Sequence, residues 1–280
     1  MSTMPRVLVV ALIALVAGPS PVAAQTAVTA PAATSLSSAE MENFLLEGRV
    51  VKNVRVLKGV TDARQVTLST GAVTHDAQIQ TVDIAKPLFE VAPKQTEINF
   101  RDCYCYNIAA YRLAVLLGLD NVPMSVKRVV EDKPAAVTWW LDEAMDEGDR
   151  RKEKLAHSNP LRAADYYGVM YVFDELIQNR DRNAGNIMWE RDSRMWMIDH
   201  TRAFRLGKDL LKPQVLERID RSLLAKMREL SASGLGDAMG RSLTKEEIAA
   251  LLARRDALVK FFDDRVAQRG EAAVLYSLAN

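Results

Sequence analysis

The stretch FDELIQNRDRNAGNIMWERDSRMWMIDHTRAF, Phe173–Phe204, constrains the fold more than any other part of the chain. Within it, the apolar segments NIMWE and MWMID flank the turn RDSR, which predicts a β-hairpin that follows a helix. Asn186 lies at the edge of the first strand and Asp199 ends the second. Because a hairpin brings its two ends together, we expect these two side chains to converge on one point. Asp181 lies shortly before them, in the loop after the helix.

Converging oxygen ligands of this kind suit Mg²⁺, which keeps several waters and binds one or two carboxylates together with substrate phosphates. Asn186 and Asp199 are therefore the candidate metal ligands. Asp181 would stand beside the metal, where a carboxylate can accept the proton of an attacking hydroxyl. We interpret Asp181 as the candidate catalytic base.

The first half of the chain has the pattern of a small sheet with one inserted helix. Residues from about 49 to 85 are rich in β-branched residues, and the turn STGA separates two predicted strands. The segment NIAAYRLAVLLGLD predicts a helix that ends at Gly118. The segments VPMSVKRVV and AAVTWWL predict two further strands.

The second half is predicted to be mainly helical. Asn159 followed by a proline predicts the start of a helix that continues to about Gln178. Thr244 and Glu247 form a capping box that opens a later helix. The sequence therefore predicts an α+β protein with a β-rich lobe and a hinge over residues 46–145. A helical lobe over residues 146–280 carries the candidate catalytic loop.

The motifs NRDRNAGN and MIDHTRAF resemble the catalytic loop and the metal-binding segment of the protein-kinase-like superfamily. The atypical branches are most similar: HipA-like kinases, phosphatidylinositol kinases and the secretory-pathway Golgi casein kinase group. The resemblance implies a two-lobed kinase fold that binds ATP and Mg²⁺ or Mn²⁺. It assigns catalysis to Asp181 and metal binding to Asn186 and Asp199. The chain departs from the usual motifs at Asn183, where these families mostly carry His, and at His200-Thr201, where many carry Phe-Gly.

The same resemblance assigns nucleotide-binding positions in the first lobe. Gly59 and Thr61 would lie near the tip of a phosphate-covering turn, and the backbone near Leu141 would read the adenine. A kinase of this type needs a lysine on the third strand and a glutamate on the helix. Gln80 and Asn107 stand at those two positions. Lys86 and Lys58 are the nearby cations that could replace the missing charge.

The N-terminus has the pattern of an export signal. Arg6 precedes the apolar run VLVVALIALVAG, and small residues favour cleavage after Ala24. Residues 1–24 are thus the predicted signal peptide, residues 25–45 are a predicted flexible tether, and the product is expected to be periplasmic or secreted. No later run is long and apolar enough for a membrane span. A net charge of +1 gives no support to a nucleic-acid partner.

Cys103 and Cys105 are the only cysteines. An oxidising compartment would permit a disulfide, but side chains two residues apart point in different directions on a strand or a helix. We therefore expect two partly buried thiols. Nothing near the pair completes a metal site.

Three functions are compatible with these patterns. The first is an exported phosphotransferase that acts on a hydroxyl of a protein, a lipid or a small molecule. The second is a pseudokinase that binds nucleotide or a partner protein, which Gln80 and Asn107 favour. The third is a metal-dependent hydrolase that uses the same carboxylates with water as the nucleophile.

Overall fold

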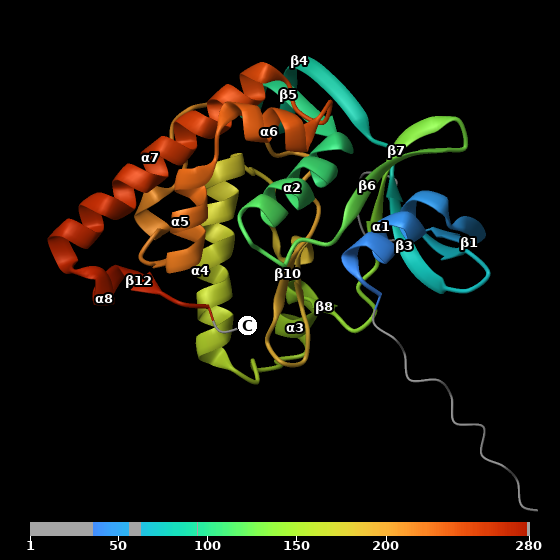
Figure 1. Cartoon of the computed structure of the whole chain (residues 1–280), viewed down its shortest axis with the longest axis horizontal. Helices are drawn as coiled ribbons and strands as arrows, with labels where there is room; N and C mark the ends of the chain where they lie inside the picture. The colour runs from blue at the N-terminus through green and yellow to red at the C-terminus, as the bar shows by residue number, and fades with distance from the viewer. Residues whose placement is uncertain (1–35, 56–62, 94, 279–280) are drawn as a thin grey trace, which may run out of the picture. The chain divides into compact units, whose positions relative to one another are not determined.

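The computed structural model describes residues 36–55, 63–93 and 95–278. The described part of the first lobe contains two helices and seven strands: α1 (Ser38–Glu47), β1 (Arg49–Arg55), β2 (Arg64–Ser69), β3 (Thr74–Gln80), β4 (Asp83–Ala92), β5 (Gln95–Cys103), α2 (Cys105–Leu116), β6 (Ser125–Val130) and β7 (Lys133–Trp139). The mainly helical remainder confirms the predicted α+β class (Figure 1).

The second lobe contains six helices, two 3-10 turns and five short strands among the described residues: β8 (Met145–Asp146), α3 (Glu147–Lys152), α4 (Pro160–Ile177), η1 (Ala184–Asn186), β9 (Ile187–Trp189), β10 (Met195–Met197), η2 (Pro213–Val215), β11 (Ile219–Asp220), α5 (Arg221–Glu229), α6 (Ala232–Met239), α7 (Lys245–Arg269), α8 (Glu271–Val274) and β12 (Leu275–Tyr276). The predicted helix after Asn159 and the capping box before α7 are both present. Within the described ranges, no helix has the length and apolar content needed to cross a bilayer.

The main sheet of the first lobe is antiparallel, with the strand order β1-β2-β3-β7-β6. One face of it packs against α1, where Phe44 and Leu45 join Val66 and Ile79 in a small core. The helix α1 starts inside the segment expected to be a flexible tether, because Ser37 and Glu40 form a capping box there. The predicted signal peptide, 1–24, lies outside the described residues.

The helix α2 lies between the main sheet and the second lobe, as Figure 1 shows. It contacts β6 and β7 on one side and α6 on the other. Arg112 donates a hydrogen bond to the carbonyl of Ala238 in α6, and the Tyr106 hydroxyl donates to the carboxylate of Glu247 at the start of α7. These contacts hold α2 against both lobes.

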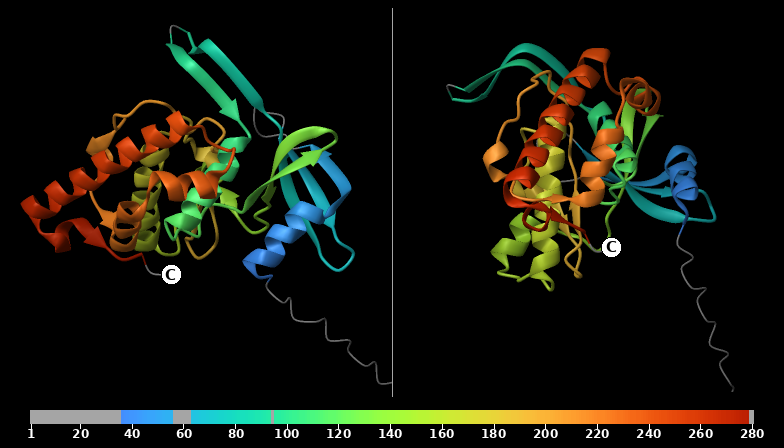
Figure 2. Two further views of the ribbon diagram at one scale, coloured as in Figure 1. Left: turned by 45° about the horizontal axis from the view of Figure 1, so that its top comes forward. Right: turned by 60° about the vertical axis from the view of Figure 1, so that its left-hand side comes forward.

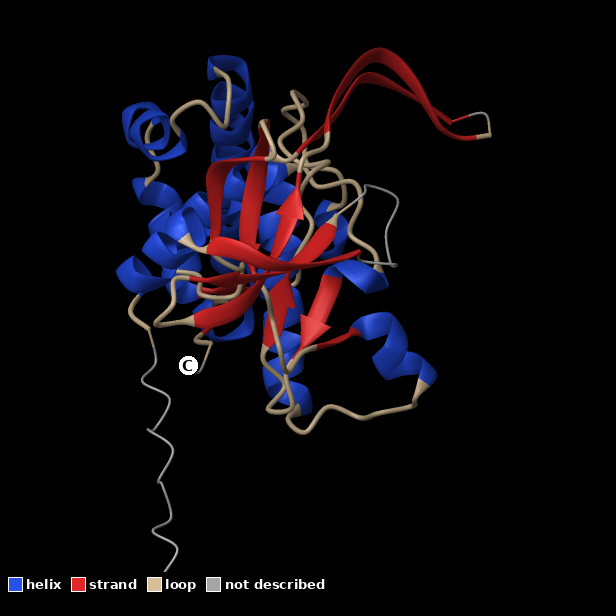
Figure 3. Ribbon diagram, turned by 90° about the vertical axis from the view of Figure 1, so that its right-hand side faces the viewer, coloured by secondary structure: helices blue, strands red, loops and turns tan. Residues whose placement is uncertain are grey.

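The strands β4 and β5 form a long hairpin that sequence analysis did not anticipate. It projects away from the main sheet in the views of Figures 2 and 3. Its two strands pair with each other and with no other strand in the described part of the chain. Leu88 and Ile98 lie opposite each other on it and are largely exposed. Because Leu88 and Ile98 are exposed while Glu97 is buried, the hairpin lacks the pattern of buried apolar and exposed polar residues by which strands are recognised.

Cys103 and Cys105 form a disulfide, so the expectation of two free thiols was wrong. Cys103 ends β5, and Tyr104 between the two cysteines has helical backbone angles. The pair therefore spans a strand-to-helix junction, where the alternation of a regular strand or helix does not apply. The Cα atoms lie 5.1 Å apart, within the range that a disulfide can bridge.

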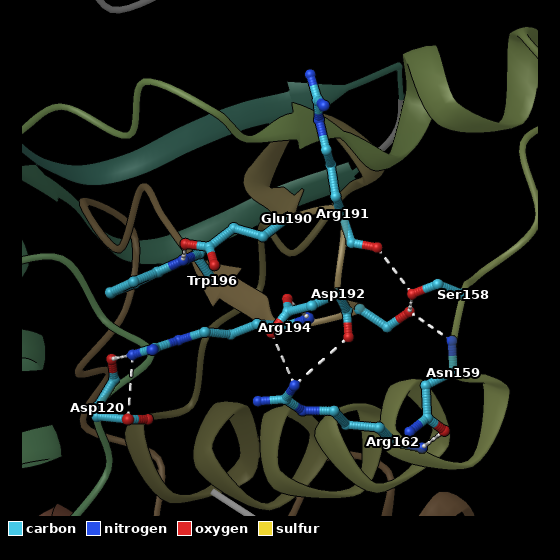
Figure 4. A network of polar contacts seen from close by, with 10 residues as sticks. Asp120, Ser158, Asn159, Arg162, Glu190, Arg191, Asp192, Arg194 and Trp196 are labelled. Atoms are coloured by element: carbon cyan, nitrogen blue, oxygen red, sulfur yellow. Dashed lines mark hydrogen bonds and ion pairs between the residues drawn. The ribbon is translucent and has the colours of Figure 1, made fainter.

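The hairpin β9–β10 is present as predicted, but its turn is anchored rather than simply solvated. The turn residue Ser193 is buried, and its hydroxyl lies 2.9 Å from the hydroxyl of Ser158. Arg162, in α4, donates to the Asp192 carboxylate, and Arg194 reaches Asp120 (Figure 4). This network fixes the hairpin that carries Asn186 and Asp199 against the start of α4.

Candidate active site

The candidate catalytic loop begins where α4 ends. Gln178 caps the helix with a positive φ of 50°, which turns the chain away from the helix axis. The Asn179 side chain then accepts a 3.0 Å hydrogen bond from the backbone N–H of Asp181. The Asp181 carboxylate is 39% exposed and lies 3.3 Å from the Arg202 guanidinium. It is therefore held in place while remaining accessible from solvent.

The structure brings the three candidate residues together. The Asn186 amide nitrogen donates a 3.0 Å hydrogen bond to the carbonyl of Asp181. The carbonyl of Asn186 accepts from the backbone N–H of Ile198, the residue before Asp199. These bonds join the loop of Asp181 to the hairpin that leads from Asn186 to Asp199.

Arg182 is the buried cation that joins the parts of this loop. It binds both carboxylate oxygens of Asp174 in α4 at 2.9 Å. The same side chain donates to the carbonyls of Asn186 and Ile198. It also lies 3.1 Å from the ring of His200. Burial and the Arg182 charge lower the pKa of His200 well below its usual value, so the neutral ring accepts this hydrogen bond.

The segment after β10 is attached to the first lobe by its backbone. Asp199 has a positive φ of 52°, and its Oδ1 accepts a 2.9 Å hydrogen bond from the Thr201 hydroxyl. The N–H of His200 donates to the Asn107 side chain at 2.8 Å, and the N–H of Cys103 donates to the carbonyl of Thr201, also at 2.8 Å. The candidate metal ligand Asp199 thus sits on a segment fixed by α2 and β5.

The predicted nucleotide-binding residues that the structure describes lie in different parts of the first lobe and of the segment that follows it. Gln80 is buried on β3, and Gln78 on the same strand lines a cavity of about 20 Å³ with Asn107 and Asp199. Sequence analysis missed Gln78, which period-2 alternation places on the same face as Gln80. Leu141 follows β7 in the segment between the lobes.

Gly59, Thr61 and Lys58 lie outside the described residues. Lys86, the other possible replacement for the strand lysine, lies on the projecting hairpin. Its ammonium group is 4.7 Å from the centre of the Phe89 ring. It lines a different cavity from the one that Gln78, Asn107 and Asp199 share.

Beside the catalytic loop, three arginines surround one buried carboxylate, Glu97 of β5. Arg205 lies 3.0 Å from Glu97, Arg202 lies 3.7 Å from it and Arg180 lies 4.0 Å from it. Burial and the two neighbouring guanidinium groups lower the pKa of Arg205, and Glu97 opposes that change. The cluster borders a pocket of about 620 Å³ between the hairpin, α2 and the start of α7. Sequence analysis missed Glu97 because its hairpin was not expected.

The donors at the candidate metal site fit a hard divalent cation. Asn186 and Asp199 offer only oxygen ligands, which Mg²⁺ and Mn²⁺ prefer. Among the described residues, no three His, Cys, Asp or Glu side chains form a complete metal site. Two protein ligands are enough where a nucleotide supplies phosphate oxygens, so the residues present fit a metal–nucleotide complex.

The fold is similar to that of solved secretory-pathway kinases. Hydra Fam20, solved with a sugar, superposes with a TM-score of 0.65 and 14% identity over 87% of this chain and 94% of that chain. The Golgi casein kinase gives a TM-score of 0.62 at 14% identity, covering 84% of this chain and 77% of that chain. Its structure with Mn/ADP bound gives 0.59 at 15% identity, covering 86% and 79%.

No protein-family model and no curated protein sequence matches the chain. The structural likeness confirms the predicted two-lobed, protein-kinase-like fold of the atypical group.

Proposed function

We propose that this protein is an exported phosphotransferase that moves the γ-phosphoryl group of ATP to an acceptor hydroxyl. The observation that carries the proposal is the hydrogen bonding that joins the loop of Asp181 to the hairpin of Asn186 and Asp199, on a fold similar to the Golgi casein kinase. That the Golgi casein kinase has been solved with Mn/ADP bound supports a metal and a nucleotide here.

The chain's own residues supply binding, orientation and one proton transfer. Asp181 accepts the proton of the acceptor hydroxyl, and Arg202 holds its carboxylate at 3.3 Å. Asn186 and Asp199 would hold Mg²⁺ or Mn²⁺, which neutralises charge on the phosphates when bound. The adenine would contact the backbone near Leu141, and Gly59 and Thr61 would cover the phosphates.

A pseudokinase is the second candidate, because Gln80 and Asn107 stand where a lysine and a glutamate normally hold the phosphates. In that case the fold would serve to bind a nucleotide or a partner protein. The side-chain oxygen of Asn107 accepts a hydrogen bond from the N–H of His200. This position therefore helps to hold the fold together, a role that does not require catalysis.

Calorimetric titration of the chain from Gln25 onward with ATP and Mg²⁺ tests the first part of the proposal. We expect binding that requires Mg²⁺ and that is lost in Asp199→Ala. The exposed Asp237 in α6 provides a matched control, and Asp237→Asn should bind as the unaltered chain does. Absence of binding in the unaltered chain would contradict the proposal and direct the search to protein partners.

Phosphate transfer from labelled ATP to candidate acceptors tests the second part. Asp181→Asn should lower turnover by about 10²- to 10⁴-fold, with no change in the thermal midpoint. A pseudokinase would be indifferent to this change. Phosphate release without any acceptor, at the same rate as with one, would instead favour the hydrolase.

A further inference from the structure

A second carboxylate, that of Asp102, is buried beside the candidate metal ligand. Asp102 is only 6% exposed. It precedes Cys103, whose N–H is bonded to the carbonyl of Thr201. The Thr201 hydroxyl lies beside Asp102 as well as Asp199, and the charges of Asp199 and Asp181 both act on Asp102. The carboxyl groups of Asp102 and Asp199 therefore both lie beside the Thr201 side chain.

The protein groups around Asp102 do not satisfy it. Its Oδ1 is buried and has no hydrogen-bond partner among the described residues. Thr201 has a single hydroxyl proton, which it donates to Asp199 at 2.9 Å. Arg202 acts on Asp102 only at a distance, and it is already paired with Asp181 and Glu97. A buried carboxylate without partners is unfavourable, so the group either takes up a proton, in line with the pKa of Asp102 that burial raises, or pairs with a cation.

We propose that Asp102 is a further ligand of the divalent cation, sharing it with Asp199 across the cleft between the lobes. This inference rests on the proposed function. The ligand it would take is a Mg²⁺ or Mn²⁺ ion that also carries the phosphates of a nucleoside di- or triphosphate. The coordinating atom would be Oδ1 of Asp102, which has no hydrogen-bond partner among the described residues.

The position of Asp102 suits this role because the segment that follows it and the segment of Asp199 are both held by α2. On its C-terminal side, the disulfide between Cys103 and Cys105 joins β5 to α2. The N–H of His200 is bonded to Asn107 in α2, which places the segment of Asp199 against the same helix. An added carboxylate would also strengthen the hold on the metal at a site where the strand lysine is replaced by Gln80. The metal would then compensate for the phosphate contacts that the strand lysine makes in other kinases.

Binding of Mn²⁺ in the presence of ADP, followed by the electron paramagnetic resonance signal of free Mn²⁺, tests this assignment without relying on turnover. We expect Asp102→Asn to weaken Mn²⁺ binding by about tenfold or more. Asp102→Glu, which keeps a carboxylate, should retain more affinity than Asp102→Asn. The control is Asp83→Asn on the same hairpin, because Asp83 is 58% exposed and lies 3.5 Å from Arg101.

The outcomes separate this inference from the proposed function. Mn²⁺ binding that is equal in Asp102→Asn and in the unaltered chain would overturn the role of Asp102 and leave the proposed function intact. Absence of Mn²⁺·ADP binding in the unaltered chain would overturn both. Circular dichroism and the thermal midpoint without metal establish that each variant is folded. If Asp102→Asn does not fold, Asp102→Ala takes its place, and equal affinities of Asp102→Ala and Asp83→Asn would overturn the assignment.

Discussion

Asn107 in α2 accepts a 2.8 Å hydrogen bond from the backbone N–H of His200, the residue that follows the candidate metal ligand Asp199. The helix position at which protein kinases carry a glutamate thus holds, in this chain, the segment of the candidate metal ligand. Both residues are buried, so water cannot replace the bond. Through this contact, the position of α2 fixes the segment that carries Asp199.

Replacing Asn107 by Leu should destabilise the protein, because the N–H of His200 would be left buried without an acceptor. We expect a loss of about 1–3 kcal/mol in the free energy of unfolding, measured with urea. Asn121 provides the matched control: it is also buried, but its side-chain atoms have no hydrogen-bond partner among the described residues. Asn121→Leu should therefore cost less, and an equal loss in the two variants would contradict the prediction.

Replacing Glu97 by Gln should disturb the arginines beside the catalytic loop. Glu97 is the carboxylate around which Arg180, Arg202 and Arg205 gather, and removing one partner of a buried ion pair costs about 3 kcal/mol or more. Because Arg202 also holds Asp181, turnover should fall while Mg²⁺-dependent nucleotide binding remains. The exposed Glu143 serves as control. A Glu97→Gln variant as stable and as active as Glu143→Gln would refute this role.

Replacing Arg182 by Lys should be costly even though the charge is kept. The guanidinium binds both oxygens of Asp174 and two backbone carbonyls at once, and an ammonium group cannot reproduce that geometry. We expect a loss of about 2–4 kcal/mol in the free energy of unfolding. The same substitution at the exposed Arg191 should change it by less than about 0.5 kcal/mol. Similar values for the two would contradict the prediction.

Glu147, the first residue of α3, should make the free energy of unfolding depend on pH in the acid range. Burial raises its pKa, but hydrogen bonds from Arg150 and Arg151 dominate and lower the pKa to about 2 from an ordinary value of 4.5. The stabilisation is therefore complete above about pH 4.5 and is lost as the pH falls toward 2. Glu147→Gln should be less stable at pH 7 by up to about 3 kcal/mol. Denaturation curves measure the difference in the free energy of unfolding between Glu147→Gln and the unaltered chain. If that difference stays constant from pH 7 to pH 2.5, the lowered pKa of Glu147 does not cause it.

The local parts of the candidate site could be predicted from the sequence. Asp181, Asn186 and Asp199 lie within one helix, loop and hairpin, and these elements are specified by apolar periodicity and by a polar turn. The anchoring of that turn through Ser193 could not be foreseen, because its partner Ser158 precedes a different element.

The long-range parts could not be predicted, because no sequence pattern specifies which distant side chains meet. Glu97 lies on a hairpin that lacks the pattern of buried apolar and exposed polar residues, and its partner Arg205 is more than a hundred residues away. The Cys103–Cys105 disulfide depends on the single residue where β5 gives way to α2. Both features follow from backbone geometry that is set by packing of the whole lobe.

The sequence by itself determined the α+β class, the order of the two lobes and the helix, loop and hairpin that carry Asp181, Asn186 and Asp199, because periodicity and turn residues specify such elements locally. Only the tertiary structure decided that Asn107 holds the segment of His200 and that Asp102 is buried beside Asp199. Burial removes water as an alternative partner. The roles of these side chains are therefore set by whichever groups the fold brings to them.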